Sequence, residues 1–497
     1  MPVARLNIGV LQIMLSFIIV LSSFTVSFAQ AAMEDQTEKP ANLARYNIDS
    51  IAFKDSIQPT FNVRRIVFEG NKRTRDIILL RELTFEVGDS IRIRDFPPKF
   101  EEAENRLMNT RLFHEAHISV LQFDEWNVDI KVVVDERNYI WPFPHLKPVD
   151  RNISQWLFKE KASFSRVDYG VKLHLDNITG NNDKLRFYFI TGYTRQLQLS
   201  YSRPYIDENL KWGIDFDILL GKNHEINYNT IDDKQAFVKF RDNAFARNFF
   251  RANIEIINRP AFYTWHTFGV AYNQLRVNDS VLKLNPNFFN SANNRIHYPE
   301  FYYKLTHREF DYNPYPTRGH AAELEILQQG LSKEVHVTQL TLKGVKYWPL
   351  TDKVFYSIGA MGSIKVPFQQ PYYFSPLLGY GDFNLRGYEF YVVDGVAGGV
   401  LNATIAQQLT NFKIHIPGTK WLTPRLIPLK IYGKLFGNAG YGYNPNPGNN
   451  RLNDKLLFGG GFGIDVVTMY DFNLKIDFSF NQLGQNGIYL QKKSTFQ

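Results

Sequence analysis

The chain has 497 residues, of which 44% are hydrophobic and 15% aromatic, and it carries a formal net charge of +8. It contains no cysteine, which excludes a disulfide framework, a cysteine-ligated metal site and a thiol nucleophile. The average apolar content and a charged fraction of 21% exclude wholesale disorder. By length alone, the chain would suit two or three soluble domains, and the rest of the sequence tests that interpretation.

Residues 1–29 have the pattern of a cleavable signal peptide. A short basic region precedes an apolar run from Leu6 to Val26, and Ser27 and Ala29 place small residues at the −3 and −1 positions. An uncleaved membrane anchor is the alternative, but the well-formed cleavage site favours removal. Residues 30–60 are polar and predict a flexible linker. The mature protein is therefore expected to be exported.

Charge is distributed unevenly along the chain. Residues 1–60 carry a net charge of −1, residues 61–137 carry −2, and residues 138–497 carry +11. The basic excess is dispersed, whereas a nucleic-acid-binding protein would carry a basic patch or stripe on a recognisable module. We therefore expect no nucleic-acid partner, and favour basic residues that face anionic lipid headgroups or a polar lumen.

Residues 61–137 predict a small α+β domain with the order β-α-α-β-β. Its first strand ends at the turn pair Gly70–Asn71, and Thr74 is placed to cap a helix that runs to about Leu83. The remaining elements are a helix opened by Pro97–Pro98 and strands at His114–Phe123 and Trp126–Glu136, the last with alternating apolar residues.

Residues 138–163 predict a linker. The pattern of residues 164–497 predicts strands that cross a membrane. Apolar and polar residues alternate over Trp212–Leu220 and again over Phe472–Phe480, and each stretch is as long as a tilted transmembrane strand. Charges such as Asp215 then face a wet lumen. A soluble β-sandwich is the alternative, but abundant aromatic residues and long polar loops favour a closed barrel, which satisfies every backbone group in lipid.

Short motifs follow one another in order along the small domain: Val67–Asn71, Arg81–Leu83, Gly88–Asp89, Leu107 with Arg111–Phe113, and Val132–Glu136. On these residues the domain resembles a POTRA domain, the periplasmic module of the Omp85 superfamily. The resemblance implies that the domain binds clients through a strand edge by β-augmentation.

Further motifs follow in order along residues 164–497: Leu175–Asn177 with Gly180 and Asp183, Ser200–Tyr201 with Pro204–Asp207, a segment with Asp311, Arg318 and Gly319, the triplet Arg386–Gly387–Tyr388, and the glycine-containing Phe436–Gly440 and Gly459–Gly463. On these residues the remainder of the chain resembles an Omp85 barrel, which in that family has 16 strands, and the triplet resembles the signature of its sixth extracellular loop. The fold class that the resemblance implies is mainly β: a transmembrane antiparallel barrel preceded by one POTRA domain.

In the family, the arginine of this triplet contacts the inner wall of the barrel. A guanidinium is always charged and donates in a planar fork, so Arg386 is expected to pin the loop, with Gly387 allowing a close approach and Tyr388 adding packing. The family usually has an acid where this chain has Asn438, close to Gly440. Asp465 is a candidate for the acidic partner.

Enzyme functions are disfavoured. The sequence has no G-x-S-x-G, P-loop or H-E-x-x-H motif, so no catalytic residue, cofactor or metal site is predicted. His114 and His117 lie three apart on a predicted strand and point to opposite faces. A barrel lipase with a Ser/His pair is the enzymatic alternative.

The resemblance implies assembly or translocation of outer-membrane proteins in a Gram-negative-type bacterium, with the POTRA domain in the periplasm. The expected partners are unfolded client proteins, outer-membrane lipids and accessory lipoproteins. A passive pore or receptor barrel is the main alternative. A two-partner-secretion transporter is less favoured, since its second POTRA domain is missing. The chain ends on Gln497, so the usual terminal aromatic is displaced.

Overall fold

The computed structural model describes residues 59–149, 156–157, 161–240, 244–415, 426–468 and 473–491. The predicted signal peptide, and nearly all of the linker predicted at 30–60, lie outside the described residues. Residues 60–497 cluster as one compact unit, in which an N-terminal domain precedes a large sheet. None of the described helices is both long enough and apolar enough to cross a membrane.

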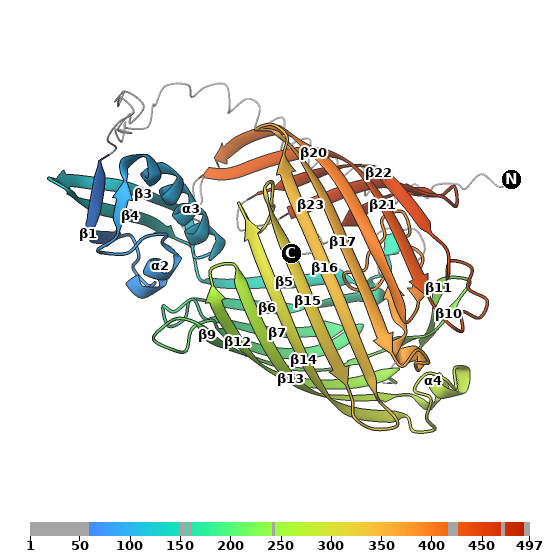
Figure 1. The fold of residues 1–497 in the computed structure, drawn as a ribbon. Helices are drawn as coiled ribbons and strands as arrows, with labels where there is room; N and C mark the ends of the chain where they lie inside the picture. Colours follow the sequence, from blue (N-terminus) through green and yellow to red (C-terminus); the bar gives the residue numbers. More distant parts are fainter. Residues whose placement is uncertain are drawn as a thin grey trace. The chain divides into compact units, whose positions relative to one another are not determined.

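The N-terminal domain is a four-stranded sheet with two helices (Figure 1). Strand order is β2-β1-β4-β3, with β1 parallel to β4 and the other pairs antiparallel. Strand β2 was not predicted, because three residues are too few to show an alternation. The elements are β1 (Thr60–Glu69), α2 (Asp76–Glu82), β2 (Ser90–Arg92), the 3₁₀ turn η2 (Ile93–Asp95), α3 (Phe96–Asn109), β3 (Phe113–Asp124) and β4 (Asn127–Glu136).

The core of this domain lies between the sheet and the helices. Val128, Ile130 and Val132 of β4 are fully buried, as are Ala103 and Leu107 of α3. Burying an aliphatic side chain of this size contributes about 1.5–3 kcal/mol relative to leaving it exposed. The alternation predicted for Trp126–Glu136 therefore positions one face of β4 in the core.

One buried side chain on β4 is charged. Asp129 is fully buried and accepts hydrogen bonds from Arg64 Nε (2.9 Å), Arg65 Nη2 (2.9 Å) and Gln122 Nε2 (3.0 Å). Hydrogen bonds to the charged form, led by the bond from Arg64, hold the pKa of the Asp129 carboxyl well below its usual range. The carboxylate links β4 to the neighbouring strand β1.

Thr74 does not cap the first helix as predicted. Helix α2 begins at Asp76 after Arg75, and no side chain caps it. The Thr74 hydroxyl is instead taken up by tertiary partners, since it donates to Glu136 Oε1 (2.5 Å) and accepts from Asn177 Nδ2 (2.9 Å). The Thr74 hydroxyl therefore bonds residues that are distant in the sequence and does not cap α2.

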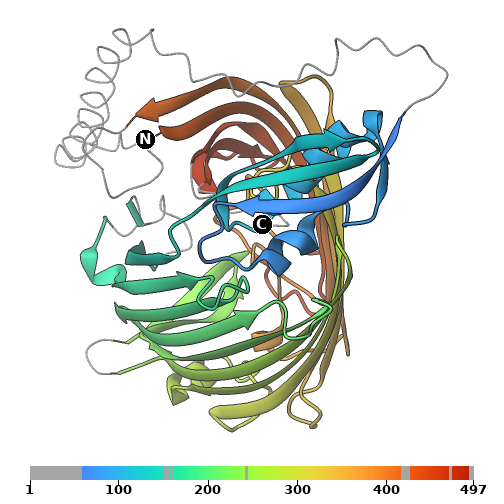
Figure 2. The same cartoon turned by 90° about the vertical axis from the view of Figure 1, so that its left-hand side faces the viewer.

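The rest of the described chain forms a 16-stranded antiparallel sheet that curls into a barrel (Figure 2). The fold class predicted from the sequence is confirmed. Its strands, in sheet order from the N-terminal edge, are β5 (Ile140–Pro148), β6 (Val167–Asp176), β7 (Lys184–Gly192), β8 (Thr194–Arg203), β9 (Trp212–Asn223), β12 (Arg247–Ala261), β13 (Thr264–Val277), β14 (Arg295–Phe310), β15 (Gly319–Gln329), β16 (Val337–Pro349), β17 (Val354–Val366), β20 (Ala397–His415), β21 (Leu426–Tyr443), β22 (Leu457–Val467), β23 (Asn473–Asn481) and β24 (Asn486–Gln491).

Smaller elements lie in the connections between barrel strands. They are the 3₁₀ turn η4 (Phe164–Arg166), the hairpin β10 (Glu225–Ile231) and β11 (Lys234–Lys239), helix α4 (Asp279–Leu284), the 3₁₀ turn η5 (Tyr372–Phe374) and the short pair β18 (Pro376–Leu378) and β19 (Val393–Asp394).

The two faces of the barrel strands differ as the alternation predicted. On β9, Trp212 and Leu220 are exposed on the outer face, while the carboxylate of Asp217 on the other face accepts a hydrogen bond from Gln198 Nε2 (2.8 Å). The exposed apolar side chains suit contact with lipid, and the paired polar side chains suit a lumen.

The linker predicted at 138–163 is wrong over part of its length. Residues Ile140–Pro148 form β5, the first strand of the sheet, which pairs with β6. Three prolines within nine residues disguise this strand, since proline is depleted from strand interiors and tolerated at edges. Within the described residues, no pairing joins β5 to β24, so these two strands end the sheet.

Candidate functional site

The connection between β17 and β20 carries the predicted triplet, and its arginine contacts the barrel wall. Arg386 Nε donates to Asn438 Oδ1 of β21 (2.9 Å), and Arg386 Nη2 donates to Thr404 Oγ1 of β20 (3.3 Å). The guanidinium carbon lies 3.9 Å from the centroid of the Phe436 ring, within range of a cation–π contact. We call this set of contacts the loop lock.

Asn438 contacts the arginine with both ends of its amide. While Oδ1 accepts from the Arg386 side chain, Nδ2 donates to the Arg386 carbonyl oxygen (2.8 Å). A carboxylate could not make the second bond, because it has no donor at neutral pH. The neutral residue in place of the family's acid thus recognises both the side chain and the backbone of one loop residue.

Gly387 brings the loop backbone against two further strands. Its φ of +94° lies in the left-handed region, and a Cβ there would lie 2.7 Å from the Phe480 carbonyl oxygen of β23. Asn481 Nδ2 donates to the Gly387 carbonyl (2.6 Å). The Tyr388 ring is buried, and its hydroxyl lies 3.3 Å from the Phe458 carbonyl oxygen of β22.

Asp465 is not the partner of Arg386 that the sequence suggested. Its carboxylate forms an ion pair with Lys434 (2.6 Å) and accepts from the Tyr315 hydroxyl (2.9 Å). Lys434 also pairs with Asp477 (2.7 Å), so the buried acids of the late strands are paired with a buried lysine on β21. Along β22, Asp465 lies six residues from Gly459, the residue that faces Asn438, which explains why it pairs elsewhere.

Gly440 lies two residues beyond Asn438 on β21. A Cβ there would be 3.0 Å from the Leu385 side chain, so the glycine leaves room for the loop just before the triplet.

The Asp311–Gly319 segment joins β14 to β15. Asp311 Oδ1 accepts hydrogen bonds from the backbone N–H groups of Thr317 (3.0 Å) and Arg318 (3.2 Å). Gly319 has a φ of +112°, and a Cβ there would lie 2.0 Å from the Glu309 carbonyl oxygen. Asp311 and Gly319 therefore shape the turn, to which Arg318 contributes its backbone.

In the N-terminal domain, Gly70 has a comparable role. Its φ is +93°, and a Cβ would lie 1.9 Å from the Val134 carbonyl oxygen, so only glycine fits where β1 ends beside β4. Asn71 Nδ2 donates to the Thr74 carbonyl oxygen (3.0 Å) and to Asp76 Oδ1 (2.6 Å). The Gly70–Asn71 pair thus sets the entry into α2.

A buried ion pair joins the N-terminal domain to the barrel. Glu82 of α2 contacts Arg259 of β12 through both carboxylate oxygens (2.6 and 3.1 Å), and Tyr205 donates its hydroxyl hydrogen to Glu82 (3.2 Å). Glu82 and Tyr205 are buried. At the end of α3, Asn109 Oδ1 accepts from the backbone N–H of Asn313 in the β14–β15 turn (2.9 Å). We call these contacts the domain junction.

Sequence reasoning missed Asp233, which joins three connections. Its carboxylate accepts from the backbone N–H groups of Arg451 (2.9 Å) and Leu452 (2.9 Å), and its carbonyl accepts from Val392 (2.9 Å). The sequence feature that could have indicated it is the pair Asp232–Asp233, since aspartate is favoured in turns. In the structure the pair lies at the tip of the β10–β11 hairpin, with left-handed φ values of 50° and 61°. The tip of this hairpin thereby contacts the connection that carries the loop lock.

The model of the Omp85 superfamily domain matches residues 177–495. The chain belongs to the Omp85 superfamily. The POTRA model, described as a surface antigen variable number repeat, matches residues 61–137. Omp85 barrel proteins are non-enzymatic insertion or translocation factors, in line with the predicted lack of enzymatic activity.

Among solved structures, the Omp85 chain is similar to CdiB from Escherichia coli, with a TM-score of 0.53 and 12% identity over 87% of this chain and 74% of that chain. It is also similar to BamA from Haemophilus ducreyi lacking POTRA domains 1–3, with a TM-score of 0.49 and 16% identity over 87% of this chain and 83% of that chain. The likeness to CdiB is one of fold. No curated protein matches the chain.

Proposed function

We propose that this Omp85 protein inserts or translocates proteins at the outer membrane, and that strand pairing at the two ends of its sheet is the working step. The observation that carries the proposal is the absence, within the described residues, of any pairing between β5 and β24. A strand edge presents N–H and C=O groups that another strand can pair with. Exchange of one set of backbone hydrogen bonds for another needs no nucleotide.

In this mechanism the POTRA domain faces the periplasm and receives unfolded outer-membrane clients. Its sheet ends in β3, a strand of twelve residues, which is long enough to pair with an extended segment by β-augmentation. The domain junction then holds this receiving sheet beside the barrel. Outer-membrane lipids and accessory lipoproteins complete the proposed set of partners.

The loop lock and Asp233 favour this function over a passive pore. Arg386 ties its connection to the barrel wall, and Asp233 ties the same connection to the segment at 450–452. An open pore has no need of a loop held inward by polar contacts to four strands. A loop that releases when strands move is suited to a barrel that changes shape during client insertion.

Depletion of the protein in its host tests the proposal. We expect the amounts of other barrel proteins in the outer membrane to fall, measured by quantitative mass spectrometry of that membrane. Unchanged amounts of those proteins together with altered solute uptake would support the passive pore and contradict the proposal.

A further inference from the structure

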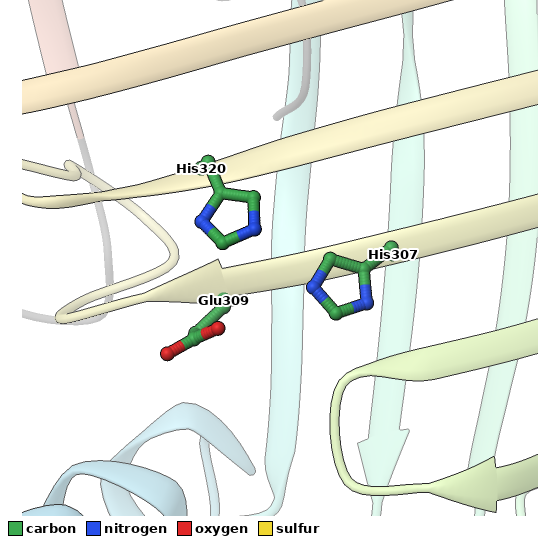
Figure 3. Close-up of side chains that lie close together, drawn as sticks. All are labelled: His307, Glu309 and His320. Atoms are coloured by element: carbon green, nitrogen blue, oxygen red, sulfur yellow. The ribbon is translucent and has the colours of Figure 1, made fainter.

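Three polar side chains gather on two neighbouring barrel strands, where β14 meets β15 (Figure 3). His307, Glu309 and His320 offer one ligand atom each, and these atoms all lie within 4.8 Å of one another. Glu309 and His320 are exposed and His307 is half-buried, so a dissolved ion can reach all three. None of them takes part in the loop lock or the domain junction. We call these three side chains the His–Glu–His cluster.

Strand geometry places the cluster on one face. Successive residues of a strand point to opposite faces, so His307 and Glu309, two apart on β14, share a face. Glu309 lies directly opposite His320 of β15, which puts the third side chain on that face as well. The exposed side chains of Phe301 and Ile326 lie on the same face of the two strands. The cluster is therefore on the outer surface of the barrel.

Sequence reasoning predicted no metal site, because the ligands come from two strands. The His-x-Glu pair on β14 supplies only two of them, and two ligands do not make a recognisable motif. His320 lies beyond the connection between the strands, and only the pairing of β14 with β15 brings it opposite Glu309. That alignment is a property of the fold and not of a local pattern.

The spacing of the cluster suits a small tetrahedral ion. Ligand atoms about 2.0–2.2 Å from a tetrahedral Zn²⁺ lie about 3.3–3.6 Å from one another. The atoms of the cluster are at most 4.8 Å apart, and rotation of side chains outside a packed core can close the difference. The centroids of the His307 and His320 rings lie 5.2 Å apart, and the small Ala322 opposite His307 leaves room for them.

The ligand types favour a transition metal over magnesium or calcium. Two imidazoles and one carboxylate are a ligand set for Zn²⁺, with water in the fourth position. Imidazole nitrogen suits Zn²⁺ and similar ions, whereas Mg²⁺ and Ca²⁺ prefer oxygen ligands.

Thr264 of β13 holds one of the imidazoles. It lies opposite His307, and its Oγ1 is 3.1 Å from His307 Nδ1. A hydroxyl can accept as well as donate, so Nδ1–H can donate to Thr264, and this tautomer leaves the lone pair of Nε2 for a metal. Histidines that ligate metals usually donate their other ring N–H to a neighbouring group. Thr264 is therefore a positioning residue of the cluster.

The charges around the cluster leave its carboxylate unpaired. Within the described part of the chain, no hydrogen bond or ion pair is made to the Glu309 carboxylate. Lys346 lies opposite His320 on β16, but its ammonium nitrogen is 5.2 Å from the centroid of the Trp348 ring, in a cation–π contact along its own strand. The negative charge of Glu309 thus remains for a cation that the two histidines also bind.

We infer that the His–Glu–His cluster binds a divalent transition metal ion such as Zn²⁺ on the outer surface of the barrel. The bound ion joins β14 to β15 beside the Asp311–Gly319 segment. Binding at this site is independent of the function proposed above. The competing explanation is that these polar side chains only contact lipid headgroups at the end of the strands, which requires no metal.

Zinc titration of the full-length protein in detergent, without an affinity tag and followed by calorimetry, separates the two. We expect His320→Asn and Glu309→Gln each to weaken Zn²⁺ binding by about tenfold or more, and a large excess of Mg²⁺ not to displace Zn²⁺. His336→Asn, at an exposed histidine outside the cluster, is the control and should bind as the wild type does. Absent zinc binding, or equal affinity in the wild type and His320→Asn, would overturn the inference.

Zinc X-ray absorption spectroscopy identifies the ligands directly. We expect two imidazoles and at least one oxygen ligand in the wild type, and one imidazole in His320→Asn loaded at higher zinc concentration. A spectrum without imidazole, or one that is unchanged in His320→Asn, would place the ion elsewhere on the chain and overturn the assignment.

Changes at Thr264 test its positioning role. Thr264→Val keeps the shape of the side chain but removes the oxygen that faces His307, so we expect Zn²⁺ affinity to fall by about tenfold. Thr264→Ser retains the hydroxyl and should restore most of the affinity. Equal affinities in the wild type and Thr264→Val would contradict this role, as would equal losses in the two variants.

Discussion

Arg259 at the domain junction and Arg386 in the loop lock are both held by polar partners, but the partners differ in charge. Arg259 contacts a buried carboxylate, whereas Arg386 contacts a neutral amide. Breaking a buried ion pair by removing one partner leaves an uncompensated charge, at a cost of about 3–5 kcal/mol. Loss of an amide partner costs less. The junction is therefore built to persist, while the loop lock is built to exchange.

The largest effect is expected at the domain junction. Glu82→Gln keeps the shape of the side chain but leaves Arg259 without its counter-charge, so we expect a loss of about 3–5 kcal/mol in the stability of this contact. Limited proteolysis of the POTRA domain in the full-length protein measures it. Glu86→Gln, an exposed acid just after α2, is the control. Equal cleavage rates in the two variants would contradict a persistent junction.

A backbone change in the loop lock is expected to have the next largest effect. Gly387→Ala adds left-handed strain and a Cβ that meets the Phe480 carbonyl, which together cost about 2–4 kcal/mol. Gly381→Ala is the matched control in the same connection, since its φ is +54° but a Cβ there meets nothing within 4 Å. Thermal unfolding of the barrel in detergent compares them. An equal or larger loss of stability in Gly381→Ala would contradict a contribution from the contact with the Phe480 carbonyl.

Changes at Asn438 sharpen the comparison between amide and carboxylate. Asn438→Ala removes both hydrogen bonds to Arg386, at a cost of about 1.5–3 kcal/mol. Asn438→Asp keeps the acceptor for Arg386 Nε but sets a carboxylate oxygen against the Arg386 carbonyl. Hydrogen exchange of the loop is expected to rank wild type as most protected, then Asn438→Asp, then Asn438→Ala. Greater protection in Asn438→Asp than in wild type would show that charge outweighs two-ended recognition.

The smallest effect is a pH dependence in the POTRA domain. The pKa of Asp129 is lowered by hydrogen bonds from Arg64, Gln122 and Arg65. Its stabilising contribution is therefore complete above its ordinary value of 3.8 and is lost as pH falls below it. Hydrogen exchange of β4 in the full-length protein, normalised for intrinsic rates, is expected to show weaker protection at pH 3 than at pH 6. Asp129→Asn should flatten this slope, and an unchanged slope would contradict the assignment.

Much of the fold could be predicted because its signals are local. The alternation over Trp212–Leu220 and Phe472–Phe480 follows from one lipid-facing and one wet face, and this pattern holds in each strand separately. The buried face of β4 is likewise visible as an alternation of apolar and polar residues within one strand. Short motifs in a set order, among them Arg386–Gly387–Tyr388, then indicated the superfamily, which the match over residues 177–495 confirms.

The parts that the sequence did not predict depend on distant partners or on competition between rules. Three prolines outweigh a weak alternation over Ile140–Pro148, so local rules predict a linker where the structure has strand β5. Glu82 and Arg259 lie 177 residues apart in the sequence, so no local pattern predicts their ion pair. Thr74 has the features of a helix cap, but its hydroxyl donates a hydrogen bond to Glu136 instead. Whether Asp465 can reach Arg386 depends likewise on how β22 is aligned with β21. Single residues do not encode that alignment.

The loop lock has a consequence for electrical sensitivity. Residues 386–389 contain one positive side chain, Arg386, and one negative side chain, Glu389, whose carboxylate accepts from the Gly387 N–H (2.9 Å). Moving one uncompensated charge through a voltage of 100 mV involves about 2.3 kcal/mol of work. A segment that carries both signs moves almost none. Displacement of residues 386–389 by themselves therefore involves almost no electrical work at any transmembrane voltage.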